Sequence, residues 1–238
     1  MAIGFRAFID FQRPDPALIE GYRGIPSANI GDSVLRMNCM FGGIHAFNNK
    51  PLVGTAFTVK VPSGDNLAAQ MALDYAKPGD IIVIDGAGYT DRALVGGMML
   101  AYAEERKLGG FVVNGAVRDI DDIMNSPLPV FAKAATPLGP YRDGPGEVNV
   151  PVVCGGQVVM PGDILVGDAD GIVVIPQRDA AEVLEAARQN LANEQAEMQR
   201  MRDGSYTQQN HLKTFTGHFL EQGGKIVDHV PYIIVEKV

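Results

Sequence analysis

The sequence predicts an α/β protein in which short aliphatic strands alternate with helices. Apolar residues make up 46 % of the 238 residues, but aromatic residues only 7 %, and there is no Trp. Several short apolar runs end in glycine, and the segments between them have helical periodicity. This alternation, with 28 glycines available for tight turns, is the pattern of strands and helices packed in layers.

The first half of the chain carries this alternation most clearly. Residues 53–61, VGTAFTVKV, are rich in β-branched residues and alternate in polarity, which predicts a strand. Before this strand, helices are expected within residues 14–41. After it we expect a helix over 67–76, a buried strand within 80–88, a helix ending at Leu108, a strand at 111–115, a tight turn, and a helix from about Asp119 to Asn125.

The second half contains short strand-like segments and then one long helix. The strand-like segments lie at 129–137, 150–159, 163–171 and 171–176, divided by Gly, Pro and Asp. The helix extends from Gln177 to Asp203 and has an aliphatic stripe on one face. No linker divides the chain, so we predict one domain over 1–238. Its core is 20–176, and 177–238 form a C-terminal helix and extension suited to packing on another subunit.

Charge and cysteine content exclude several classes of function. The net charge is −8, from 20 basic and 28 acidic residues, and no basic run is present, which argues against a nucleic-acid partner. The two cysteines lack CxxC spacing, so neither a thiolate metal site nor a redox dithiol is indicated, and a reducing cytoplasm is expected. No apolar stretch approaches the ~20 residues that span a bilayer, so no membrane partner is expected.

Gly96-Gly97-Met98-Met99 is the first candidate site. Two adjacent glycines inside a helix would cost roughly 1 kcal/mol each relative to alanine, so we expect them at a helix start. There the first N–H groups have no helical partner, and the helix dipole adds positive potential, which suits a carboxylate. The alternative is that the glycines only let two elements pack closely.

Arg118-Asp119 is the second candidate site. The pair follows a buried strand, and ligands gather beyond the carboxyl ends of strands in open α/β sheets. Strand ends at Asp85-Gly86 and Asn114-Gly115 could bring two turns to one rim. Arg118 could bind a carboxylate or oxyanion, and Asp119 could bind Mg²⁺. The alternative is a salt bridge between the two and a helix N-cap. Lys60 and Lys133 give no convincing Schiff-base site.

Several segments together resemble the RraA-like family. They are GDN at 64–66, PGDIIVIDGAGYTDRALVGG at 78–97, GFVVNGAVRD at 110–119 and PVVCGGQVVMPGDILVGDADGIVVIP at 151–176. The family includes 4-hydroxy-4-methyl-2-oxoglutarate/4-carboxy-4-hydroxy-2-oxoadipate aldolases and protein regulators of ribonuclease E. The resemblance covers roughly residues 20–205. It implies a swivelling β/α/β-type sandwich fold, assembled as a homotrimer or homohexamer with the active site at a subunit interface.

The resemblance to the aldolases also implies roles for the candidate residues. The backbone N–H groups of Gly96 to Met99 would bind the pyruvate carboxylate. Arg118 would bind pyruvate and stabilise its enolate, and Asp119 would hold a divalent metal, Mg²⁺ or Mn²⁺. The metal would act as a Lewis acid, which is class II aldolase chemistry and explains an expected oxaloacetate decarboxylase side activity.

This sequence departs from the family pattern at one position. The usual motif has an Asp twenty-one positions before the arginine, where this chain has Gly97. A glutamate from a neighbouring subunit's C-terminal helix also contributes in the aldolases, and either Glu194 or Glu197 could match it. Backbone anion binding survives the change at Gly97, whereas an acidic group that positions water does not.

Three functions follow from these observations. The first is a metal-dependent lyase that cleaves 4-hydroxy-4-methyl-2-oxoglutarate or a related 4-hydroxy-2-oxo dicarboxylate to pyruvate. The second is a related metal-dependent enzyme acting on another 2-oxo acid, which Gly97 favours. The third is a non-catalytic binding protein that resembles the ribonuclease E regulators. The long C-terminal extension and the Arg118-Asp119 pair favour an enzyme.

Overall fold

The computed structural model describes residues 2–41 and 43–227 and divides the chain into two compact units. The first unit ends at Asn190 and the second begins at Leu191. The last eleven residues of the predicted C-terminal segment, 228–238, lie outside the described residues. The predicted α/β class is confirmed, with a large sheet, flanking helices and a long C-terminal helix.

Among the described residues, ten strands form one sheet in the first unit. They are β1 (Phe5–Ala7), β2 (His45–Ala46), β3 (Leu52–Lys60), β4 (Asp80–Asp85), β5 (Ala93–Val95), β6 (Gly110–Val117), β7 (Val130–Ala135), β8 (Gly146–Val148), β11 (Ile164–Asp168) and β12 (Gly171–Ile175). The main order is β1-β8-β3-β4-β6-β7-β2, with β5 on β6, and with β11 on both β3 and β12. β9 (Val152–Cys154) and β10 (Gln157–Val159) form a separate hairpin. The centre β3-β4-β6-β7 is parallel, so the carboxyl ends of these strands lie at the same edge.

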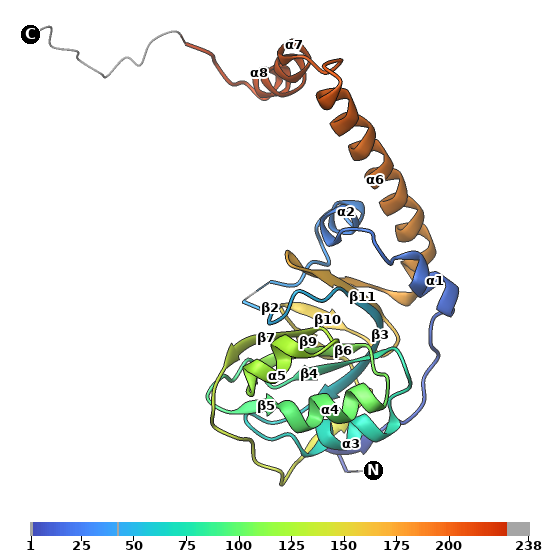
Figure 1. The fold of residues 1–238 in the computed structure, drawn as a ribbon, viewed down its shortest axis with the longest axis vertical. Helices are drawn as coiled ribbons and strands as arrows, with labels where there is room; N and C mark the ends of the chain where they lie inside the picture. The colour runs from blue at the N-terminus through green and yellow to red at the C-terminus, as the bar shows by residue number, and fades with distance from the viewer. Residues whose placement is uncertain (1, 42, 228–238) are drawn as a thin grey trace, which may run out of the picture. The chain divides into compact units, whose positions relative to one another are not determined.

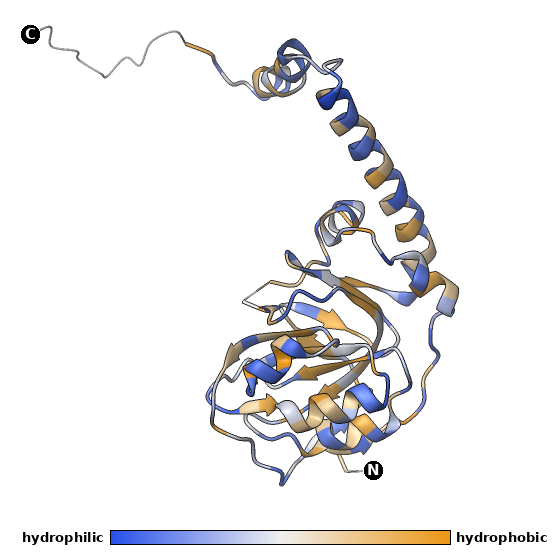
Figure 2. Ribbon diagram, in the orientation of Figure 1, coloured by the Kyte–Doolittle hydropathy of each residue, from blue (hydrophilic) through white to orange (hydrophobic). Residues whose placement is uncertain are grey.

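Three helices cover one face of the parallel strands: α3 (Leu67–Tyr75), α4 (Gly97–Glu105) and α5 (Ile120–Asn125) (Figure 1). Successive side chains on a strand point to opposite faces. Phe57 and Ile82 therefore belong to the core cluster under these helices, while Ala56 and Ile81 belong to a second cluster that includes side chains of the β9–β10 hairpin. Figure 2 shows the apolar colouring of the strands between these layers.

Strand β6 differs from its prediction. A tight turn was expected after a strand at 111–115, but the strand continues beyond Gly115 to Val117. The added residues pair with β5 and β7, with an irregular register between Val113 and Ala116, so their backbone groups are satisfied in extended form. Asp85 pairs with Asn114, and the chain turns only at Arg118-Asp119. The predicted position of the turn after β6 is therefore wrong, but Arg118-Asp119 still follows the carboxyl end of β6, at the same edge of the sheet as the end of β4.

The terminal helices largely follow their predictions. Near the N-terminus, α1 (Pro16–Gly21) and α2 (Ser27–Ser33) form, but the helix stops at Val34, because Leu35 and Arg36 adopt positive φ. The predicted long helix is present as a 3₁₀ turn, η1 (Gln177–Asp179), followed by α6 (Ala180–Arg202). The second unit also contains α7 (Gln208–His211), the π-helical turn η2 (Leu212–Thr216) and α8 (Gly217–Glu221). Within the described ranges, no helix has the length and apolar character to cross a membrane.

Candidate active site

The glycine pair lies at the start of α4, as predicted. Gly96 is the N-cap residue in extended conformation, and Gly97 is the first residue of the helix. The Gly97 N–H donates to Oδ2 of Asp119 at 2.8 Å, and the Met99 N–H donates to the Gly96 carbonyl at 3.0 Å. The two predicted motifs, twenty-two residues apart, are thus joined by a hydrogen bond. Met98 N–H belongs to the first turn, whose N–H groups have no partner inside the helix.

Arg118 and Asp119 form the turn between β6 and α5. The Arg118 N–H donates to the Val95 carbonyl at 3.0 Å, which fixes the turn to the end of β5. Asp119 is the N-cap residue of α5 and has left-handed backbone angles, φ 60° and ψ 53°. Aspartate tolerates this region better than most residues, but the conformation still stores strain, and such strain clusters at functional sites.

Both structural alternatives for this pair are partly realised. Nε of Arg118 lies 3.6 Å from Oδ2 of Asp119, so the salt bridge is present. Asp119 stands at the N-cap position, but its side chain makes no capping hydrogen bond and turns to Gly97 instead. The two side chains are 37 % and 44 % exposed, which leaves both accessible to a ligand.

Asp122, which the sequence did not predict as a candidate, lies beside the glycine pair. A Cβ added to Gly97 would collide with Oδ2 of Asp122 and would lie 3.5 Å from Oδ2 of Asp119. Two carboxylates from one turn of α5 therefore face the first residue of α4. The sequence spacing could have indicated Asp122, because it lies three residues after Asp119 and residues three apart on a helix lie on one face. A residue larger than glycine at position 97 would therefore displace the Asp122 carboxylate from its present place.

Four predicted residues meet in one small pocket at the N-terminus of α4. Gly96, Met98, Met99 and Arg118 line it, and its volume is about 50 Å³. Arg118 and Asp119 also line a second, more open hollow of about 340 Å³ beside β7 and the segment that follows it. The Arg118 side chain thus borders both hollows, where it can contact an anion in either.

Asn66 and Arg142 line the same small pocket, and neither was predicted for it. Asn66 is only 2 % exposed, and its Oδ1 has no hydrogen-bond partner among the described residues. The GDN segment at 64–66 includes Asn66, but the motif does not predict that the Asn66 side chain lines this pocket. The position of Arg142 comes from a loop that crosses to Gly64 and Asp65, which a single sequence does not show.

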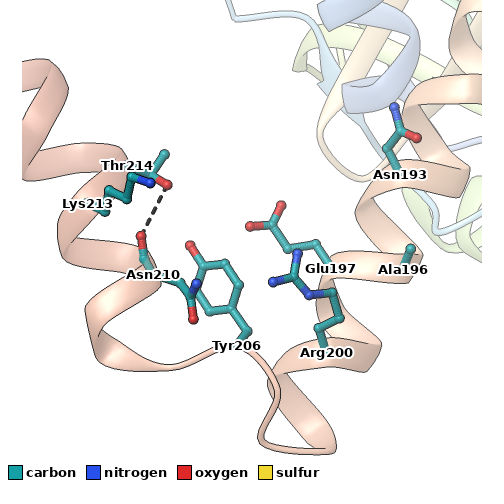
Figure 3. Close-up of a pocket in the computed structure, with 8 residues that line it drawn as sticks. All are labelled: Asn193, Ala196, Glu197, Arg200, Tyr206, Asn210, Lys213 and Thr214. Carbon is teal, nitrogen blue, oxygen red and sulfur yellow. Dashed lines mark hydrogen bonds between the residues drawn. The ribbon is translucent and has the colours of Figure 1, made fainter.

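Glu194 and Glu197 belong to the second unit and are exposed. Glu197 lines a hollow of about 570 Å³ with Arg200, Tyr206 and Asn210, as Figure 3 shows. The contribution of either glutamate to a neighbouring subunit's site stays a prediction. No group of three or more His, Cys, Asp or Glu side chains suited to a metal occurs in the part of the chain that the structure describes.

Comparison with known proteins gives consistent results. Residues 27–174 match the RraA-like family model, described as Aldolase/RraA. A Halalkalibacterium halodurans protein named "Putative 4-hydroxy-4-methyl-2-oxoglutarate aldolase" is 41 % identical over 179 residues, 75 % of this chain and 85 % of that protein. The 4-hydroxy-4-methyl-2-oxoglutarate aldolase of Thermus thermophilus is 37 % identical over 113 residues, 48 % of this chain and 69 % of that enzyme.

Solved structures show the same relationship. The RNA-processing inhibitor RraA from Thermus thermophilus has a TM-score of 0.59 at 30 % identity, covering 63 % of this chain and 92 % of that one. Streptomyces coelicolor RraAS2, titled an unusual member of the RNase ES inhibitor RraA family, has a TM-score of 0.72 at 26 % identity, covering 81 % and 100 %. The relatives therefore include proteins named as aldolases and proteins named as inhibitors.

Proposed function

The chain belongs to the RraA-like, Aldolase/RraA, family, and we propose that it is a lyase of that family. The proposed reaction is divalent-metal-dependent cleavage of 4-hydroxy-4-methyl-2-oxoglutarate, or a related 4-hydroxy-2-oxo dicarboxylate, to pyruvate. Oxaloacetate decarboxylation is the proposed side activity, and a homotrimer or homohexamer the proposed assembly. The observation that carries the proposal is the Arg118 guanidinium beside the Asp119 carboxylate at the N-terminus of α4, where the Asp122 carboxylate also lies.

The two carboxylates fit a divalent cation. Asp119 and Asp122 both lie within 3.5 Å of the point that a Gly97 Cβ would occupy. Mg²⁺ commonly takes one or two protein carboxylates and completes its octahedron with water and substrate oxygens, so two carboxylates suffice. When bound there, Mg²⁺ or Mn²⁺ supplies a Lewis acid that stabilises negative charge on the 2-oxo acid.

Arg118 and the helix N-terminus bind and orient the substrate in this proposal. The guanidinium can donate two parallel hydrogen bonds to a carboxylate or to an oxyanion. The N–H of Met98 and the positive end of the α4 dipole favour an anion in the same pocket. In the cleavage, the bond between C3 and C4 breaks, the C4 hydroxyl passes its proton to water and becomes the carbonyl of the second product, and the electron pair enters the pyruvate enolate, which water then protonates at C3. Arg118 stabilises the charge that develops on the oxo oxygen.

The experiment is an assay of the purified chain with Mg²⁺. We expect pyruvate release from 4-hydroxy-4-methyl-2-oxoglutarate and carbon dioxide release from oxaloacetate. EDTA and Arg118→Ala should each abolish both activities, whereas Arg178→Ala, at an exposed arginine whose ion pair is with the adjacent Asp179, should retain them. If neither substrate is turned over with or without metal, the lyase proposal is wrong, and a non-catalytic binding protein like the RraA inhibitors becomes the better explanation.

A further inference from the structure

The small pocket at the N-terminus of α4 contains a buried acceptor without a donor. Nδ2 of Asn66 donates to the Leu94 carbonyl at 2.8 Å and lies 3.4 Å from Sδ of Met99. Because a carbonyl can only accept, this contact defines which amide atom is which, and Oδ1 is the atom left without a partner. Buried polar atoms of this kind are rare and call for a donor from a ligand or water.

The Asn66 side chain does not cap the N-terminus of α3, although its position suggests this role. It is the N-cap residue of α3, where asparagine side chains commonly accept from the first helical N–H groups. Here the side chain makes no such bond, and the Leu67 N–H donates to Asp65 instead. The neighbouring carboxylate thus caps the helix, and the Asn66 amide instead contacts Leu94 and Met99, which line the same pocket.

Arg142 brings a second guanidinium to this pocket. Its loop is held on both sides: Tyr141 N–H donates to the Gly64 carbonyl at 2.8 Å, and Asp143 and Gly144 N–H groups donate to Oδ2 of Asp65 at 2.7 and 3.0 Å. Asp65 itself is 4 % exposed, so this anchor is built into the core. By contrast, the Arg142 side chain has no hydrogen bond or ion pair among the described residues.

A further arginine reinforces the same loop. The Arg92 guanidinium lies 3.9 Å over the Tyr141 ring and donates to the Gly139 carbonyl at 2.7 Å and to the Tyr141 hydroxyl at 2.8 Å. The backbone on each side of Arg142 is therefore ordered, while its charged end is available. Two arginines lining one pocket, Arg118 and Arg142, match a ligand with two negative groups.

We propose that Asn66 and Arg142 form a distal subsite that selects hydroxylated dicarboxylates. Arg142 binds the carboxylate at the far end of the substrate, and Asn66 Oδ1 accepts a hydrogen bond from the C4 hydroxyl. A carboxylate cannot satisfy the Asn66 acceptor, whereas a hydroxyl can. The inference rests on the lyase proposal, since it assigns the same site a substrate that extends beyond its 2-oxo-acid end.

Calorimetry with two ligands that cannot undergo aldol cleavage tests the role of Arg142. 2-Oxoglutarate and 2-oxopentanoate differ only in a terminal carboxylate or methyl group, and neither has a C4 hydroxyl. With Mg²⁺ present, the unaltered chain should bind 2-oxoglutarate at least about 10-fold tighter, as expected for a charged hydrogen bond. Arg142→Gln should remove this preference without weakening 2-oxopentanoate binding, and Arg178→Gln should retain it.

The calorimetric result does not depend on turnover, so failure of the lyase proposal can be told apart from failure of the subsite. A preference for 2-oxoglutarate that persists in Arg142→Gln, or its absence in the unaltered chain, would overturn the assignment of Arg142. Because Arg142 lies on an exposed loop, the calorimetric test of Arg142 remains valid even if substitutions of the buried Asn66 impair folding.

Asn66→Ala tests the hydroxyl contact by comparing two reactions at one site. Cleavage of 4-hydroxy-2-oxoglutarate uses a C4 hydroxyl, whereas decarboxylation of oxaloacetate does not. We expect kcat/KM for cleavage to fall about 10-fold further than kcat/KM for decarboxylation, the size of one lost hydrogen bond in a buried site. Equal losses would mean that Asn66 Oδ1 meets a water or serves structure alone, and the hydroxyl assignment would be wrong.

Discussion

Gly97 leaves a space that the Asp122 carboxylate fills, and Gly97→Asp should therefore impair the protein unless Asp122 is removed. A Cβ at position 97 would collide with Oδ2 of Asp122 and touch Oδ2 of Asp119. The Asp122 side chain is exposed and its carboxylate is a flexible end that can rotate away, so the larger cost is electrostatic. Like charges about 4 Å apart repel by about 1 kcal/mol in water and about 4 kcal/mol near a protein surface. The backbone at Gly97 is ordinary helix, and an Asp in the first turn of α4 gains only about 0.3–1 kcal/mol from the helix dipole. The repulsion between the carboxylates is therefore expected to exceed the gain from the helix dipole.

The double variant Gly97→Asp/Asp122→Ala should reverse the loss. It removes the collision and keeps two carboxylates at the site, one of them at the position where the aldolase motif has its Asp. Asp122→Ala alone should weaken Mg²⁺ activation by about 10- to 100-fold, the loss typical of removing a group that supports a metal site. The double variant should recover most of that loss, which corresponds to a coupling of about 1–3 kcal/mol between the two positions.

Two assays measure this double-mutant cycle, which consists of the unaltered chain, the two single variants and the double variant. Urea unfolding of the four proteins gives the stability of each, and pyruvate release as a function of Mg²⁺ concentration gives the metal dependence. Asp121→Ala, which removes a neighbouring carboxylate in the first turn of α5, is the matched control. The reasoning fails if Gly97→Asp is as stable and as active as the unaltered chain. It also fails if the double variant is no better than Asp122→Ala, because the two carboxylates would then not be interchangeable.

Two further predictions concern groups outside this cycle. Asp65→Asn should lower the free energy of unfolding by about 1–3 kcal/mol, because Oδ2 of Asp65 accepts the N–H groups of Asp143 and Gly144 and an amide cannot replace both oxygens; unchanged urea unfolding would contradict this. Burial raises the pKa of the Cys154 thiol, with Asp85 adding to the shift, so at pH 8 the thiol is neutral in the folded chain. Mass spectrometry should find Cys154 alkylated only after unfolding, and labelling at the same rate in the folded protein would refute this burial.

Local patterns determined much of the fold and of the candidate site. The β-branched run of β3 and the aliphatic run of β4 predicted these strands correctly, because side-chain alternation and burial follow from neighbouring residues. The glycine pair predicted the start of α4, because the cost of glycine inside a helix is a local property. Arg118-Asp119 could be predicted as a candidate site for a similar reason, because the pair directly follows a strand that is recognisable from its own residues.

The tertiary structure decided which distant residues share this site. Strand β6 passes Gly115 without turning because β5 and β7 provide hydrogen-bond partners, and these come from other parts of the chain. The Asp122 carboxylate fills the space at Gly97 only because α5 packs at the start of α4. Arg142 reaches the pocket because Asp65 holds its loop. Such contacts join residues far apart in sequence, and propensity and periodicity carry no information about them.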